Sequence, residues 1–226
     1  LYMIGSVPMM GFLFDLDGVL VDSEKQYTRI WESINSEFPT GVDDMPQRIK
    51  GTTLDKILSE YYPDAEVRKK VTARLYELEA KMVYAMTPGA NELLEKLANR
   101  MVGVALVTSS DSHKMNHLWK DLKGLKKCFN VIIDATQVTR SKPDPQGYLL
   151  AAHSLNADPE ACVVFEDSLQ GVKAGKAAGC YVVGVAGTLK REVIEPYCDR
   201  VVDSLEEIDP DEIISRLITR TTEHDL

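Results

Sequence analysis

The fold of this chain is limited first of all by a series of short apolar segments in which polar and apolar residues do not alternate. They cover residues 11–14, 102–108, 130–134, 161–166 and 181–186, and residues 200–203 form a candidate sixth segment. Such segments are typical of parallel strands, because both faces of the strand are covered by helices. The chain between them carries helical periodicity. We therefore predict an α/β fold with a doubly wound, Rossmann-like parallel sheet.

Three helices between or after these segments have a recognisable start. A capping side chain precedes a proline in the dipeptides Thr87-Pro88, Asp144-Pro145 and Asp209-Pro210. Proline is tolerated at the first helical position, because its missing N–H would have no partner in the helix there. We therefore predict that a helix begins at each of these prolines.

Residues 23–86 interrupt the alternation, because they contain no strand-like segment. Apolar residues at helical spacing predict helices near residues 27–38, 54–61 and 67–82, with joints at Pro39 to Gly41, Met45-Pro46 and Tyr62-Pro63. We therefore expect two domains: a helical cap of residues 23–86, and an α/β core of residues 11–22 and 87–226. An insertion after the first strand lies above the carboxyl ends of the strands, where open α/β sheets bind ligands, so the cap is expected to be a lid. Residues 1–10 are expected to be irregular.

Charge and cysteine content restrict the environment and the partners of the chain. The 26 Lys and Arg residues and 35 Asp and Glu residues give a net charge of −9, which disfavours binding to nucleic acid or to anionic membranes. The opening uncharged stretch of 14 residues is too short to span a bilayer. No CxxC spacing occurs, and Cys162 and Cys180 lie in apolar segments, so we expect free thiols and a cytoplasmic location. We expect a monomer or a weak dimer.

Residues suited to phosphoryl transfer stand after several of the predicted strands. Asp15 and Asp17 follow the first strand, Glu166 and Asp167 end the fourth, and Lys142 precedes a later helix; Thr108, Ser109 and Ser110 follow the second strand. Carboxylates supply the oxygen ligands that Mg²⁺ prefers. Hydroxyl groups, the N–H groups of a helix N-terminus and lysine bind phosphate oxygens. Taken alone, Asp15 and Asp17 would also fit an ordinary strand end and turn, but the four sets together predict a phosphoryl-transfer site.

These motifs resemble those of the haloacid dehalogenase superfamily, in the branch with a helical cap after the first strand. The similar segments are DLDGVLVDS, VTSS, KPDP and EDSLQGVKAGKAAG, and the resemblance to β-phosphoglucomutases and sugar-phosphate phosphatases extends from Gly11 to about Val202. It implies that Asp15 is the nucleophile and that Asp17 is the general acid and base. It also implies that Mg²⁺ is held by Asp15, the Asp17 carbonyl and Asp167 with Glu166 nearby, and that Thr108, Ser109, Ser110 and Lys142 surround the phosphoryl group.

The segment QRIKGTTLDKIL resembles the substrate-specificity loop of this family. Lys50 and Gly51 match it, and we expect both, together with Arg48, to bind substrate. Leu54 stands where mutases carry an arginine that binds a second phosphate, and Tyr27 stands near the position of a mutase histidine. Both departures favour hydrolysis, although Arg48 could partly replace the arginine.

Our leading hypothesis is a Mg²⁺-dependent phosphatase that hydrolyses a small phosphorylated metabolite, a sugar or polyol phosphate, through an aspartyl phosphate. A β-phosphoglucomutase-like mutase is the first alternative. A catalytically inactive metabolite-binding module on the same fold is the second. A nucleotide-binding domain is disfavoured, because no glycine-rich loop follows the first strand.

Two further patterns are interpreted as structural. His113 and His117 have the spacing of metal ligands on a helix, but no Glu or Cys completes a set, so we expect no second metal there. Gly171, Gly175 and Gly179 recur every four residues, which predicts a smooth helix face that packs closely on the sheet.

Overall fold

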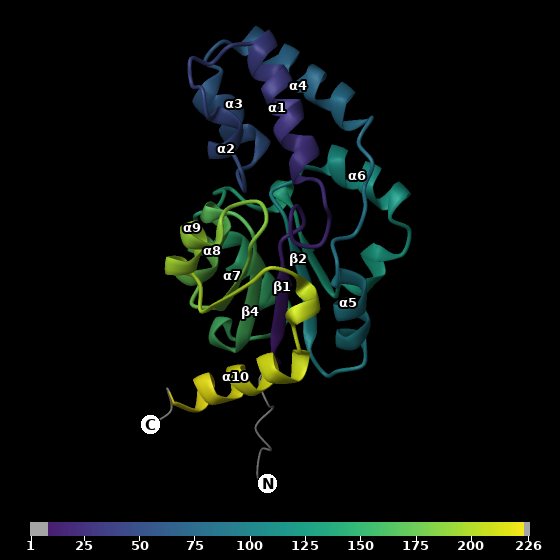
Figure 1. Cartoon of the computed structure of the whole chain (residues 1–226), viewed down its shortest axis with the longest axis vertical. Coiled ribbons are helices and arrows are strands. Elements are labelled where there is room, and N and C mark those ends of the chain that lie inside the picture. Colours follow the sequence, from purple (N-terminus) through teal and green to yellow (C-terminus); the bar gives the residue numbers. More distant parts are fainter. Residues whose placement is uncertain (1–8, 224–226) are drawn as a thin grey trace.

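The computed structural model describes residues 9–223 of the chain (Figure 1). Its centre is one sheet of six parallel strands in the order β3-β2-β1-β4-β5-β6. The strands are β1 (Gly11–Phe14), β2 (Gly103–Val107), β3 (Val131–Ile133), β4 (Cys162–Glu166), β5 (Tyr181–Val185) and β6 (Arg200–Val202). The predicted strands, the candidate sixth included, and the doubly wound α/β fold are thus confirmed. The strand order reverses beside β1, which is where sheets of this kind bind ligands.

Helices cover both faces of the sheet. Phe12, Phe14 and Phe165 pack with α5 (Ala90–Ala98), α6 (Ser112–Asp121) and α10 (Pro210–Glu223) on one face. Leu13 and Val164 pack with α7 (Gln146–Ser154) and α8 (Leu169–Ala177) on the other. Successive strand residues point to opposite faces, so a strand that is buried on both sides needs apolar residues at every position. This explains the unbroken apolar segments of the sequence.

The remaining helices around the sheet are short. They are α9 (Arg191–Ile194) and the 3₁₀ helices η1 (Leu125–Cys128), η2 (Ala135–Gln137), η3 (Pro159–Ala161), η4 (Glu195–Tyr197) and η5 (Leu205–Glu207). None of the helices between residues 9 and 223 is long and apolar enough to cross a membrane. All four cysteines are free, and Cys162 and Cys180 are buried.

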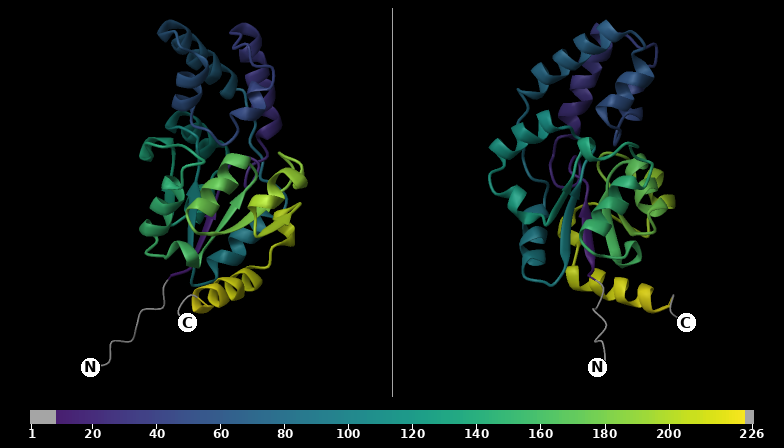
Figure 2. Two further views of the ribbon diagram at one scale, coloured as in Figure 1. Left: turned by 90° about the vertical axis from the view of Figure 1, so that its left-hand side faces the viewer. Right: turned by 180° about the vertical axis from the view of Figure 1, so that it is seen from behind.

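The segment between β1 and α5 forms a layer of helices beyond the carboxyl end of the sheet (Figures 1 and 2). It contains α1 (Glu24–Glu37), α2 (Met45–Arg48), α3 (Leu54–Tyr61) and α4 (Ala65–Glu79). Its two connections to the sheet lie side by side. The Asp22 N–H donates to the Ala85 carbonyl at 2.9 Å, and the Thr87 N–H donates to the Leu20 carbonyl at 3.0 Å. The chain thus enters and leaves this helical layer at a single place.

Several predicted boundaries are wrong. The dipeptide Met45-Pro46 is not a joint but opens α2, since a proline in the first helical turn sacrifices no intrahelical hydrogen bond. Helix α5 begins after Gly89 rather than at Pro88. Helix α7 has Pro145 as its N-cap rather than as its first residue, whereas α10 begins at Pro210 as predicted. Of the terminus predicted to be irregular, residues 1–8 lie outside the described residues, and residues 9 and 10 belong to no helix or strand.

The glycines of α8 follow the prediction only in part. A Cβ atom on Gly171 would lie 1.8 Å from the Glu166 carboxyl group, and one on Gly175 would lie 3.0 Å from Val182. These two glycines therefore allow α8 to approach the sheet closely. Gly179 has no such neighbour; its φ of +84° places it just beyond the end of the helix, in the left-handed conformation that favours glycine.

Candidate active site

Asp15 lies at the end of β1, where its backbone N–H still donates to the Phe165 carbonyl at 3.0 Å. Its buried carboxylate accepts a hydrogen bond of 2.7 Å from the Lys142 ammonium group. The same ammonium group donates to Glu166 Oε1 at 2.6 Å and to the Val107 carbonyl at 3.1 Å. Lys142 therefore joins the carboxyl ends of three neighbouring strands and fixes the orientation of Asp15.

Burial makes the electrostatic environment of this group unusual. It raises the pKa of Asp15 to about 8; Lys142 opposes the shift, whereas Glu166 and Asp17 add to it. Burial also acts to lower the pKa of Lys142, but Asp15 and Glu166 outweigh it and raise that pKa above its ordinary value. Lys142 thus stays protonated, and one ammonium group serves two carboxylates.

The residues suit a divalent cation. Carboxylate oxygens of Asp15, Glu166 and Asp167 lie within 4.8 Å of one another. Burial, reinforced by Glu24, Glu166 and Asp15, raises the pKa of Asp167 well above its ordinary range. Asp167 Oδ2 is buried and has no hydrogen-bond partner among the described residues. A small hard cation such as Mg²⁺ takes oxygen ligands of this type and would offset the repulsion, so the donor set fits Mg²⁺.

Asp17 has a separate set of partners. Its carboxylate accepts hydrogen bonds from the Ser23 hydroxyl, from the Ser110 hydroxyl at 3.3 Å and from the Lys114 ammonium group at 2.5 Å. Lys114 is buried, and its Nζ lies 4.1 Å from the centre of the Tyr27 ring, which adds a cation–π contact. Lys114 was not predicted to be a site residue. Its position in α6 gives no signal of burial, because charged residues on a helix usually face solvent.

The loop after β2 carries the three predicted phosphate-binding hydroxyl residues. Thr108 Oγ1 accepts a hydrogen bond from the Ser110 N–H at 3.1 Å and donates to Ser110 Oγ at 3.0 Å. Ser109 Oγ donates to the Gly51 carbonyl at 2.8 Å. The loop therefore contacts the helical layer directly through Ser109, while Thr108 holds the loop in shape.

A cavity of about 110 Å³ lies between the sheet and the helical layer. Its wall includes the predicted site residues Asp15, Asp17, Lys50, Gly51, Ser109, Ser110 and Asp167. Thr108 and Lys142 are buried and are not among the residues of this wall. The volume is below the roughly 300–1,000 Å³ of typical small-molecule sites. We therefore expect the helical layer to move away from the sheet when a ligand enters.

The remaining predicted binding residues of the helical layer differ in their placement. The Lys50 ammonium group lies in the cavity wall and pairs with Glu24 at 2.9 Å. Leu54 also lines the cavity. Arg48 does not: its guanidinium group is largely exposed and pairs with Asp44 at 2.7 Å. The structure therefore does not bring Arg48 to the site, because α2 directs its side chain to the outside.

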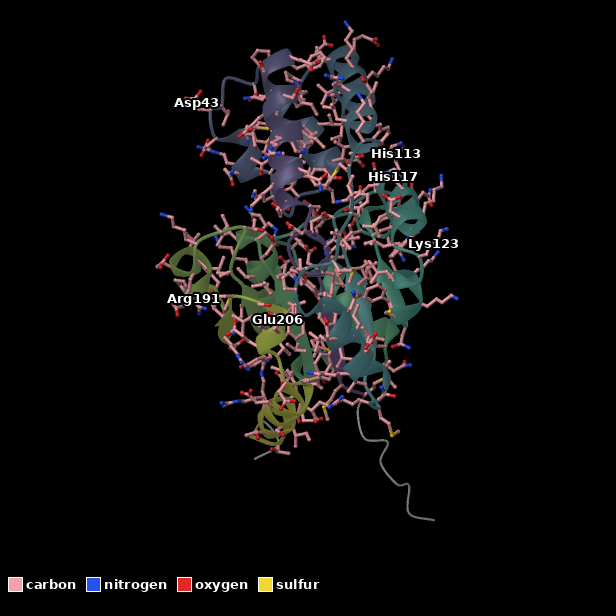
Figure 3. The ribbon with its side chains drawn as sticks, turned by 45° about the vertical axis from the view of Figure 1, so that its right-hand side comes forward. Asp43, His113, His117, Lys123, Arg191 and Glu206 are labelled. Carbon is pink, nitrogen blue, oxygen red and sulfur yellow. The ribbon has the colours of Figure 1, made fainter. Side chains whose placement is uncertain are left out.

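The cavity wall contains a further acidic residue that the sequence analysis missed. Glu79, at the end of α4, accepts a hydrogen bond of 2.6 Å from the Tyr27 hydroxyl. Glutamate on a helix usually faces solvent, but only 5% of the surface of Glu79 is exposed. His113 stacks on Tyr76 with a ring separation of 3.8 Å, and His117 meets the edge of Tyr84. Both histidines belong to α6 near the helical layer (Figure 3) and engage aromatic rings.

The chain is similar in sequence to known proteins. The model of the family described as haloacid dehalogenase-like hydrolase matches residues 12–185. The phosphorylated carbohydrates phosphatase of Thermotoga maritima is 35% identical over 182 residues, covering 76% of this chain and 82% of that protein. Hexitol phosphatase A of Escherichia coli is 34% identical over 203 residues, covering 88% of this chain and 92% of that protein.

Two further matches show that similarity alone does not assign one activity to this chain. The bifunctional riboflavin kinase/FMN phosphatase of Arabidopsis thaliana is 31% identical over 214 residues, but the chain spans only 53% of that protein's length. A solved structure described as a putative beta-phosphoglucomutase from Bacteroides vulgatus superposes with a TM-score of 0.78 at 25% identity, covering 94% of this chain and 91% of that one. Proteins named as phosphatases and a protein named as a mutase are thus both similar to this chain.

Proposed function

Because the chain belongs to the haloacid dehalogenase-like hydrolase family, we propose that it is a phosphatase that hydrolyses a small phosphorylated metabolite through an aspartyl phosphate on Asp15. One observation carries the proposal. Two carboxylates, Asp15 and Asp17, line the same cavity but have different partners: Asp15 lies beside a cluster suited to a cation, and Asp17 lies beside Lys114. Two carboxylates in different environments suit the two roles that this chemistry requires.

In the proposed reaction, a carboxylate oxygen of Asp15 attacks phosphorus as the bond to the leaving-group oxygen breaks. Asp17 donates a proton to that oxygen, and the alcohol departs. Asp17 then takes a proton from a water molecule, which attacks the aspartyl phosphate and regenerates Asp15 with release of inorganic phosphate. Lys142 keeps Asp15 in position. The hydroxyl groups of Ser109 and Ser110 are engaged with Gly51 and Asp17, so the backbone N–H of Ser109 would donate to a phosphoryl oxygen.

The proposal includes Mg²⁺ as the cofactor. Asp15, Asp167 and the Asp17 carbonyl would hold it, with Glu166 nearby. Bound there, Mg²⁺ supplies positive charge that offsets the charge on the phosphoryl oxygens. The buried, unpartnered Asp167 Oδ2 supports this assignment.

For the substrate we propose a sugar or polyol phosphate. Two of the relatives above are named for phosphorylated carbohydrates and for hexitols. The helical layer, which we propose to be a separate cap domain of residues 23–86, closes over the cavity through the contact of Gly51 with Ser109. A closed cavity excludes water from all but the reacting position, as phosphoryl transfer requires.

A mutase remains the second candidate, because the chain shares its fold with a structure described as a putative beta-phosphoglucomutase. A mutase must bind a second phosphate at the far end of the sugar. Leu54 occupies the cavity wall where a cation would be needed, Lys50 is already paired with Glu24, and Arg48 points outside. An inactive binding module is the third candidate, and it would have no need of the Asp15 arrangement. These observations favour hydrolysis.

The experiment that tests the proposal measures phosphate release from sugar and polyol phosphates with Mg²⁺, in the wild-type chain and in Asp15→Asn. We expect release by the wild type and a loss of at least about 10⁴-fold in the variant, since covalent catalysis is removed. Asp43→Asn, on the outer loop of the helical layer (Figure 3), is the matched control. With β-glucose 1-phosphate and a trace of the 1,6-bisphosphate, faster formation of glucose 6-phosphate than of inorganic phosphate would establish the mutase instead. No turnover of any compound would favour the inactive module.

We also propose a cytoplasmic location. Burial raises the pKa of the Cys162 thiol to about 12, so this thiol stays neutral and unreactive. Free cysteines are typical of proteins in reducing compartments.

A further inference from the structure

Glu79 presents a hydrogen-bond acceptor to the cavity that no group of the described chain satisfies. Its Oε1 accepts from the Tyr27 hydroxyl at 2.6 Å. Its Oε2 is buried and has no hydrogen-bond partner within residues 9–223. His113 Nδ1 lies 3.5 Å away but makes no hydrogen bond to it. A buried carboxylate oxygen without a hydrogen-bond donor costs free energy, so we expect a ligand group to donate a hydrogen bond to Oε2.

The position of Glu79 relative to Asp17 places it on the leaving-group side of the cavity. Lys114 Nζ contacts Asp17 at 2.5 Å and lies 4.1 Å from the centre of the Tyr27 ring. The hydroxyl of the same tyrosine then reaches Glu79. These contacts lead from the proposed general acid, Asp17, to α1 and α4 of the helical layer. The part of a substrate that departs as the alcohol occupies this side.

The charges of the cavity limit what that alcohol can carry. A carboxylate only accepts hydrogen bonds, so the ligand group must donate one; in the sugar and polyol phosphates proposed above, the donor is a hydroxyl group. Lys114 already places a positive charge near Glu79, which disfavours a second ammonium group. An anionic group would meet Glu24, Glu79 and Asp111 in the wall. Both lysines that line the cavity in the described chain are paired with a carboxylate, Lys50 with Glu24 and Lys114 with Asp17.

The structure assigns Glu79 as a specificity-determining residue: it accepts a hydrogen bond from a hydroxyl of the substrate's leaving group, so that the cavity selects uncharged polyhydroxy monophosphates over compounds with a second anionic group. This inference rests on the proposed phosphatase function, in which the alcohol departs on the side of Asp17. Leu54 and Trp31 line the same wall and would contact the carbon chain of such an alcohol.

A binding experiment in the Asp15→Asn chain tests the assignment without depending on turnover. Dissociation constants of sorbitol 6-phosphate and n-hexyl phosphate are measured by calorimetry with Mg²⁺, and their ratio gives the preference for hydroxyl groups. Adding Glu79→Gln should reduce this preference at least about tenfold, which corresponds to the loss of a charge-assisted hydrogen bond. The Tyr27 hydroxyl would keep the amide oxygen, so an NH₂ group would face the substrate hydroxyl. That hydroxyl could then accept only a neutral hydrogen bond in place of the charge-assisted bond that it donates to Glu79.

Glu77→Gln is the matched control, because Glu77 lies on the same helix but is exposed and pairs with Arg74 and Lys81. It should leave the preference unchanged. Thermal unfolding of Glu79→Gln checks that the variant is folded. Because the readout is binding, failure of the proposed function, seen as unchanged turnover in Asp15→Asn, is distinguishable from failure of this inference.

Three outcomes would overturn the assignment. The first is a preference for sorbitol 6-phosphate that does not depend on Glu79, because it is either equal in Glu79→Gln and Glu77→Gln or absent when Glu79 is present. The second is tighter, Glu79-dependent binding of 6-aminohexyl phosphate, which would identify an ammonium group as the ligand. The third is binding of glucose 1,6-bisphosphate that is tighter than binding of glucose 6-phosphate.

Discussion

Replacing Lys142 by methionine should strongly destabilise the protein in metal-free buffer. The lysine side chain is 7% exposed and donates to Asp15 at 2.7 Å and to Glu166 at 2.6 Å. Without its charge, the carboxylates of Asp15, Glu166 and Asp167 remain clustered, and Asp15 and Glu166 lose their ammonium partner. Removing one partner of a buried ion pair costs about 3–5 kcal/mol. For a chain of this size, about 1 kcal/mol corresponds to 2–4 °C, so we expect Tm to fall by about 6–20 °C.

Differential scanning calorimetry in EDTA measures this effect, and Lys120→Met is the matched control. Lys120 is an exposed lysine of α6, so its replacement should change stability by no more than about 0.5 kcal/mol. Combining Lys142→Met with Glu166→Gln should restore part of the loss, because it removes one unpaired charge. Excess Mg²⁺ should restore part of it as well. A Tm for Lys142→Met within about 2 °C of that for Lys120→Met would refute the charge argument.

Three further outcomes are expected. Gly51→Ala should raise KM by about tenfold in a steady-state assay, because Gly51 has a φ of +75° and an added Cβ would lie 2.6 Å from Ser168 Oγ, which hinders closure; unchanged KM would contradict the closed contact. Asp64→Ala removes the N-cap of α4, whose carboxylate accepts from two backbone N–H groups, and should lower the unfolding free energy by about 1 kcal/mol in urea titrations without changing kcat. Chelation of Mg²⁺ should abolish phosphate release and Ca²⁺ should not restore it, since Ca²⁺ takes more ligands at longer distances; activity in chelator would argue against the Asp167 assignment.

The sheet could be predicted from the sequence because parallel strands buried on both faces allow few residue types. Phe12, Leu13 and Phe14 are all buried, because helices cover both faces of the sheet at β1. The strand β1 has the predicted bounds. Helix starts were less predictable. Proline is compatible with several positions near an N-terminus, so Pro46 opened a helix where we expected a joint, and Pro88 preceded the N-cap Gly89.

Site residues that directly follow a strand could be predicted from the sequence. Site residues that lie on a helix face were harder to predict. Asp15, Asp17 and Asp167 follow strands, and the structure brings all three to one cavity; their chemical roles remain predictions. Lys114 and Glu79 depend on how α6 and α4 rotate and pack, which their own sequences do not specify. A charged residue on an amphipathic helix usually faces solvent, so only tertiary structure could show that these two are buried.

The paired connections between the sheet and the helical layer have an evolutionary consequence. The strand-like crossing at Val21 pairs with the returning chain at Met86, so 64 intervening residues begin and end at one spot. A segment whose ends meet can be exchanged, lengthened or replaced without altering the register of β1, because the sheet experiences only the two crossing strands. Recombination at this joint would therefore combine one α/β sheet with many different helical layers. Selection on substrate range can then act on the helical layer while the residues at the strand ends stay unchanged.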